Sequence, residues 1–208
     1  MPEHVPEGRP HRPRRPTLRA DLSEALGCDS NDPAARHERA HTTARVVLAA
    51  GRSGTAEQAS LVTLGDTVGL DELAQLWRHA EPGTLPATLW ALYLLRAWCY
   101  RSGAEVARLY RGGRRHAEVA DVIAGVPEAP DAGDMARLAD TLLADVFSGD
   151  LGTSLERAAA FSRILAAGRS EQATAGGDTS PGELGARALE VAAQLERAAA
   201  AWRAGGLH

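Results

Sequence analysis

The residues best suited to metal binding or catalysis are two histidines one helical turn apart, in the segment HERAH at 37–41. Histidines at positions i and i+4 share one face of a helix and can both bind a zinc ion, while the glutamate between them polarises a metal-bound water. Asp32-Pro33 supplies an N-cap and a first-turn proline, which predicts a helix from about residue 33 to 50. That helix would place both imidazoles on one stripe with Ala44 and Leu48.

The surroundings of this motif argue against a zinc enzyme. The motif resembles that of zinc proteases, which usually keep the two middle positions uncharged, whereas Arg39 occupies one of them here. The longer pattern of the metzincins requires glycine and histidine where Ala44 and Val47 stand. A third ligand would have to come from Glu57 or Glu72, and neither lies in a recognisable motif. The segment therefore predicts structural histidines that border the core rather than a metal site.

Arginine supplies the basic character of the chain, which contains no lysine. Enzymes that need a Schiff-base lysine or a P-loop lysine are thereby excluded. The formal net charge is −4, yet arginines gather in residues 1–19 and 101–115, ahead of an acidic stretch at 116–150. Because arginine contacts to phosphate give sequence-independent binding, the candidates for binding nucleic acid or an acidic partner are Arg9, Arg12, Arg14, Arg15, Arg108, Arg111, Arg114 and Arg115.

Residues 1–16 hold five prolines and few apolar side chains, which predicts a disordered basic arm. Within the arm, Gly8-Arg9-Pro10 resembles the core of an AT-hook, with Glu7 where a basic residue is expected. We therefore expect the arm to bind nucleic acid weakly, without sequence preference and at low salt.

Residues 106–126 resemble the first half of a resolvase-type helix-turn-helix. The shared features are Leu109-Tyr110, a turn at Gly112-Gly113, the run Glu118-Val119-Ala120, and Gly125-Val126. In that family the helix after Gly-Val reads the major groove. Here that helix would be rich in acids, which phosphates repel, so the resemblance implies a helical hairpin without base recognition. The acids are Glu128, Asp131, Asp134, Asp140 and Asp145.

The fold class is indicated by residues 84–101, in which the run from Leu85 to Tyr100 is apolar on every helical face and carries one charge, Arg96. A helix that is apolar all round is usually buried, and at about 16 residues this one is shorter than the roughly 20 needed to cross a bilayer. Pro86 suits its first turn. The sequence thus predicts an all-α protein, a single irregular helical bundle around this central helix, whose core would include Leu89, Trp90, Leu92, Tyr93, Leu95 and Trp98.

Periodicity and glycine positions divide the rest of the chain. We expect a helical domain at 17–168 that ends at Gly168, a flexible linker at 169–180 and a tethered C-terminal helix at 181–205. The last helix carries a heptad seam that could pack on its own bundle or on a second chain in a homodimer. The seam comprises Leu184, Ala188, Val191, Leu195, Ala198 and Trp202.

The sequence predicts a non-enzymatic interaction or regulatory protein without a cofactor, whose partner is another protein or a second copy. The alternatives are a nucleic-acid-binding or transcription-associated protein, and a zinc-dependent hydrolase on His37, Glu38 and His41. No apolar signal segment follows the basic N-terminus, so a cytoplasmic, reduced protein is expected, with Cys99 as a core residue. Residues 85–98 and 154–161 are similar to small uncharacterised helical proteins of high-GC bacteria, some with transcription-related labels.

Overall fold

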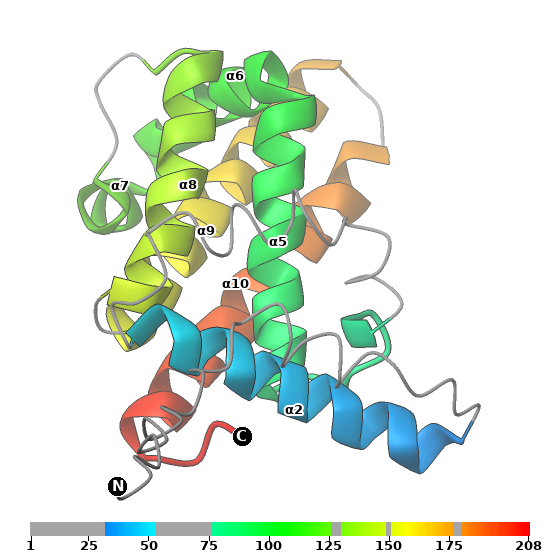
Figure 1. Ribbon diagram of the computed structural model, residues 1–208. Helices are drawn as coiled ribbons and strands as arrows, with labels where there is room; N and C mark the ends of the chain where they lie inside the picture. The colour runs from blue at the N-terminus through cyan, green and yellow to red at the C-terminus, as the bar shows by residue number, and fades with distance from the viewer. Residues whose placement is uncertain (1–31, 53–75, 126–129, 149–150, 177–179) are drawn as a thin grey trace, which may run out of the picture.

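The protein is a bundle of helices (Figure 1). The structure, a computed structural model, describes residues 32–52, 76–125, 130–148, 151–176 and 180–208, and all regular elements in these ranges are helical. This confirms the predicted all-α class. The elements are α2 (Pro33–Arg52), α5 (Leu85–Arg101), α6 (Gly103–Gly113), the 3₁₀ turn η1 (Arg114–His116), α7 (Glu118–Ala124), α8 (Ala132–Ser148), α9 (Leu151–Gly176) and α10 (Ser180–Arg203).

The prediction that α5 is the central helix is wrong: among the described helices, α9 is the one that packs against α6, α7, α8 and α10. Helix α5 begins after the N-cap Thr84, with a proline in its first turn. It contacts α8 along its length, and α2 crosses the lower ends of both (Figure 1). The core face of α5 holds Leu89, Leu92, Tyr93 and Leu95, all buried.

The prediction that α5 is buried on every face is wrong. Trp90 and Trp98 are only partly buried against the core, and Leu94 is 47% exposed. An amphipathic pattern cannot reveal this, because the outward face of α5 is itself built from apolar residues. One side of α5 thus borders the surface.

The buried charge of α5 is neutralised across the bundle. Arg96 is buried, and its Nε donates a hydrogen bond of 2.8 Å to Asp140 Oδ1 on α8. The Tyr100 hydroxyl donates to the other oxygen of the same carboxylate at 2.5 Å, and the Arg96 guanidinium lies over the Tyr100 ring. A buried charge needs such partners, so this pair fixes the register of α5 against α8.

Helices α6 and α9 cross at glycines, which allow their backbones to touch. A Cβ atom on Gly113 would lie 1.8 Å from the carbonyl oxygen of Ile164, and one on Gly168 would lie 2.0 Å from that of Leu109. The expectation that Gly112-Gly113 forms a turn and that Gly168 ends a helix is therefore wrong. Gly168 lies inside α9, whereas Gly112 and Gly113 are the last two residues of α6 before η1. The missing side chains of Gly113 and Gly168 make room for the neighbouring helix.

The predicted linker at 169–180 is also wrong for most of its length, since α9 continues to Gly176. Its polar residues bind other elements instead of solvent. Arg169 pairs with Glu105 of α6 at 3.0 Å, and Glu171 pairs with Arg115 at 2.7 Å. Composition suggested a linker because ion-pairing residues and solvated residues look alike in the sequence.

Helix α10 is not tethered but packs antiparallel on α9 within the same chain. Leu195 and Ala198 of the predicted seam are buried, and Val191 and Trp202 pack against the core at their sides. The sequence left open whether this seam packs on its own bundle or on a second chain. In the structure it packs on its own bundle. The side chain of Leu184 lies outside the described residues.

Several predicted features fall outside the described residues. They are the arm at 1–16 with Arg9, Arg12, Arg14 and Arg15, the start of the domain at 17–31, and Cys28, Glu57 and Glu72. Among the helices that are described, none is long and apolar enough to span a membrane.

Candidate functional site

The short helix α7 has the opposite orientation to an ordinary surface helix, which buries its large apolar residues. Its small residues face the bundle: Ala124 is buried, and Ala117 and Ala120 pack partly against the core. Its large apolar residues face solvent, with Val119 76%, Val122 82% and Ile123 46% exposed. Exposed apolar side chains that cluster on one element are typical of an interaction surface.

A single carboxylate holds α7 in this orientation. Asp121 accepts a hydrogen bond of 2.7 Å from the Tyr110 hydroxyl of α6, and Arg114 donates to it through Nε at 3.2 Å and Nη2 at 2.8 Å. Burial and the bond to Asp121 raise the pKa of Tyr110, so the hydroxyl keeps its proton and remains a donor. These hydrogen bonds attach α7 to α6 and η1 through Asp121, so the large apolar residues of α7 remain exposed to solvent.

Beside α7 runs a groove of about 1070 Å³, whose other wall is α10 and whose floor is α9. The walls carry Val119, Ile123 and, from α10, Leu189, which is 48% exposed. The floor is a single stripe of α9 at intervals of three and four residues, which places its members on one face. These floor residues are Glu156, Ala160, Arg163, Ala166, Ala167 and Ser170.

Ion pairs within the chain neutralise the charges on the floor of the groove. Arg163 of the floor forms a bidentate pair with Glu196 of α10, at 2.7 and 2.6 Å, and this bond lowers the pKa of the glutamate. Glu156 is paired with Arg203 at the far end of α10. The groove thus offers apolar walls and a floor of alanines between charges that are already paired.

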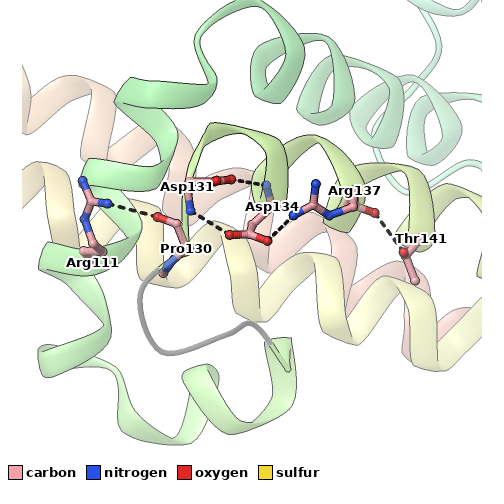
Figure 2. Close-up of polar contacts among 6 residues, drawn as sticks. All are labelled: Arg111, Pro130, Asp131, Asp134, Arg137 and Thr141. Atoms are coloured by element: carbon pink, nitrogen blue, oxygen red, sulfur yellow. Dashed lines mark hydrogen bonds and ion pairs between the residues drawn. The ribbon is translucent and has the colours of Figure 1, made fainter.

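The arginines predicted to bind nucleic acid or a partner do not form one free basic strip. Arg114 is committed to Asp121, Arg115 to Glu171, and Arg111 donates a hydrogen bond of 3.0 Å to the carbonyl oxygen of Pro130 (Figure 2). Arg108 is exposed on α6. The structure therefore engages three of these four side chains in intramolecular contacts, and Arg115 alone of the four lines the groove.

The helix that corresponds to the DNA-reading element of the resolvase-type family is α8. Asp131 and Asp134 cap its first turn reciprocally, each carboxylate accepting a hydrogen bond of 2.8 Å from the backbone N–H of the other (Figure 2). Arg137 is bound to Asp134 at 2.5 Å. These contacts, led by the bond from the Asp131 backbone, lower the pKa of Asp134, so the exposed start of α8 is negatively charged at neutral pH.

The two histidines of the HERAH motif lie on one side of α2, as its spacing predicts. Their ring centroids are 4.4 Å apart; His41 is half-buried beside Ala44 and Leu48, and His37 is exposed. Within the described part of the chain, no group of three histidine, cysteine or acidic side chains could hold a metal ion. The suggested third ligands lie outside that part, so the zinc alternative gains no geometric support.

Burial lowers the pKa of His41 below its ordinary value of 6.5, and the nearby His37 and Arg45 act in the same direction, against Glu81. The unfolded chain therefore takes up a proton at higher pH than the folded one. We expect the free energy of unfolding to fall as the pH drops below 6.5. Urea denaturation at about pH 7.5 and about pH 5.5 should show a smaller loss in His41→Gln than in the unchanged protein. An equal loss in both would exclude His41 as the cause.

Cys99 is a core residue, as predicted. Burial, with a smaller contribution from Asp140, raises the pKa of its thiol to about 12. A thiol in this environment remains protonated and is a poor nucleophile.

Apart from Arg115, the groove residues were not predicted from the sequence. The stretch Glu118–Ala124 contains large apolar residues on one face and alanines on another, and both faces satisfy an apolar pattern. The one signal available was that three alanines, at 117, 120 and 124, recur at helical spacing beside larger residues.

With this geometry in hand, the chain was compared with protein-family models, curated proteins and solved structures, and no match was found in any of them.

Proposed function

We propose that this protein is a non-enzymatic interaction protein that binds an amphipathic α-helix of a protein partner in the groove between α7, α9 and α10. The observation that carries the proposal is the inverted orientation of α7, which exposes Val119 and Ile123 along one wall. Leaving such residues in water costs free energy that their burial under a partner would recover.

The dimensions of the groove fit a helix. The floor stripe extends from Glu156 to Ser170 of α9, which corresponds to about 21 Å or four helical turns. The α10 wall runs antiparallel to α9, since Glu196 pairs with Arg163 and Arg203 pairs with Glu156. A helix laid between the walls would complete a packed layer on α9, in the helix-in-groove mode of recognition.

The chemistry of the groove defines the face of the incoming helix. Alanines at 160 and 167 let a second helix approach closely, at the short end of the usual 8–10 Å. Since Arg163 and Glu156 are already paired within the chain, a charge on the incoming face would be desolvated without a partner. We therefore expect a helix with apolar residues at i, i+3/i+4 and i+7 and charges only on its outer face.

A displayed library of amphipathic helical peptides of about four turns tests this proposal. Peptides selected on the unchanged protein should bind Val119→Glu and Leu189→Glu at least about tenfold more weakly, because each change places a charge on an apolar wall. Val122→Glu is the matched control: it lies on α7 and is 82% exposed, but it does not line the groove. It should retain binding.

Thermal unfolding of the same variants separates lost binding from lost folding. All three positions are exposed, so the melting temperatures should change little. Selected peptides that bind both wall variants as tightly as the unchanged protein would contradict the proposal, as would a library that yields no binding peptide.

A further inference from the structure

We propose that the helix bound in the groove carries one primary amide, an asparagine or glutamine side chain, near the middle of its apolar face, where it binds Arg163 and Glu196. This inference rests on the proposed function, because it names a side chain of the helix that binds there. Arg163 stands about two helical turns from Glu156 and from Ser170, the two ends of the groove floor. A helix that fills the groove therefore covers this guanidinium instead of leaving it at the solvent-exposed rim.

The ion pair leaves one nitrogen of Arg163 without a partner in the described part of the chain. Nε and Nη2 donate to the two oxygens of Glu196 at 2.7 and 2.6 Å, and Nη1 donates to no described residue. Because the guanidinium is planar, Nη1 lies on the edge turned away from Glu196. The Arg163 side chain is 44% exposed, so Nη1 is hydrated until a helix covers it.

The pair decides which side chain can cover it. An apolar residue would leave the N–H groups of Nη1 buried and unpaired, which weakens binding. A carboxylate would accept from Nη1 but would lie beside Glu196, whose pKa is lowered by its bond to Arg163 and which is charged at neutral pH. A lysine or arginine would be repelled by Arg163. A primary amide suits both partners, because its carbonyl oxygen accepts from Nη1 and its NH₂ group donates to Glu196.

The alanines of the floor define the neighbours of this amide. Ala160 and Ala167 lie about one turn from Arg163 on either side, and their small side chains leave room for large apolar residues of the incoming helix. Among its face positions at i, i+3/i+4 and i+7, the amide takes whichever of i+3 and i+4 faces Arg163, and the other remains apolar. Such a buried polar position fixes register between packed helices.

Fluorescence anisotropy of peptides selected from the helical library tests the amide. Peptides that bind the unchanged protein should be enriched in asparagine or glutamine at one position in the middle of the bound face. Changing that amide to leucine should weaken binding at least about tenfold, because Nη1 is then covered without an acceptor. Changing it to the matching acid, which adds a charge at nearly the same size, should also weaken binding.

Variants of the protein show whether the preference comes from this ion pair. Arg163→Met combined with Glu196→Leu removes the pair and should bind the leucine peptide at least as tightly as the amide peptide. Glu156→Leu combined with Arg203→Met removes the pair at the end of the groove. It is the matched control and should keep the amide preference. Thermal unfolding should confirm that both double variants are folded, since all four side chains are partly exposed.

The outcomes distinguish the two proposals. Peptides that bind the wall variants Val119→Glu and Leu189→Glu more weakly, but carry only apolar residues on the bound face, would overturn this inference and leave the proposed function standing. An amide preference that survives the loss of Arg163 and Glu196 would have the same meaning. A library that yields no binding peptide, or peptides that bind both wall variants unchanged, would overturn both.

Discussion

Replacing Gly113 with alanine should destabilise this protein more than other changes of one methyl group. The new Cβ would lie 1.8 Å from the carbonyl oxygen of Ile164, which is backbone and cannot rotate away. Alanine is otherwise favoured over glycine in a helix by about 1 kcal/mol, so the sign of the effect is informative. We expect a net loss of roughly 3 kcal/mol or more, as helices α6 and α9 are forced apart. Gly168→Ala, on the opposite side of the same crossing, should behave alike.

Gly185→Ala is the matched control for this prediction. It lies where α10 faces α9, but the nearest atom to its added Cβ, Ser170 Oγ, would be at an ordinary 3.5 Å. Its stability should be unchanged or raised by up to about 1 kcal/mol. Urea denaturation of the three variants measures the difference. A Gly113→Ala protein as stable as Gly185→Ala would show that α6 and α9 do not cross at these glycines.

Leu92→Ala should cost about 2–5 kcal/mol, the range for a leucine removed from a closed core. Leu92 is buried on the face of α5 that contacts α8, so little can relax into the cavity. Leu94, two residues further on, is 47% exposed, and Leu94→Ala should change stability by no more than about 0.5 kcal/mol. Trp90→Ala should fall between them, since Trp90 is only partly buried.

Thermal unfolding gives this ranking directly, at about 2–4 °C for each kcal/mol in a chain of this size. The comparison tests which face of α5 is the core, because both leucine variants have the same composition and the same helix propensity. Equal melting temperatures for Leu92→Ala and Leu94→Ala would contradict the described packing.

The sequence was sufficient for the features that local chemistry determines. The N-cap and first-turn proline at 32–33 and the apolar run at 85–100 predicted α2 and α5, and both helices begin where these signals stand. From Met135 to Val146 apolar residues recur at intervals of three and four, which is typical of a helix, and in α8 they are buried. In each case the signal lies within the helix it describes.

Features that depend on a partner element could not be predicted in the same way. A glycine looks the same in the sequence whether it ends a helix or allows two helices to touch. The difference depends on the backbone that lies opposite: Ile164 opposite Gly113, and Leu109 opposite Gly168. Both of these partners are far away in sequence. Arg169 and Glu171 look like linker residues until Glu105 and Arg115 are placed opposite them.

The orientation of α7 belongs to the same class. Whether valines or alanines face the bundle is decided by the bond that Asp121 makes to Tyr110 and Arg114. In the sequence both faces of α7 are apolar, so the pattern does not show which face is exposed. The groove beside the exposed face therefore could not be predicted.

The most direct test of the central claim is to locate a bound helix on the molecule. We expect a selected helical peptide, added to methyl-labelled protein, to shift the NMR signals of Val119, Ile123, Ala160, Ala167 and Leu189. The signals of Leu94 on α5 should stay in place. Shifts confined to the exposed face of α5, with none at the walls or floor of the groove, would contradict the account.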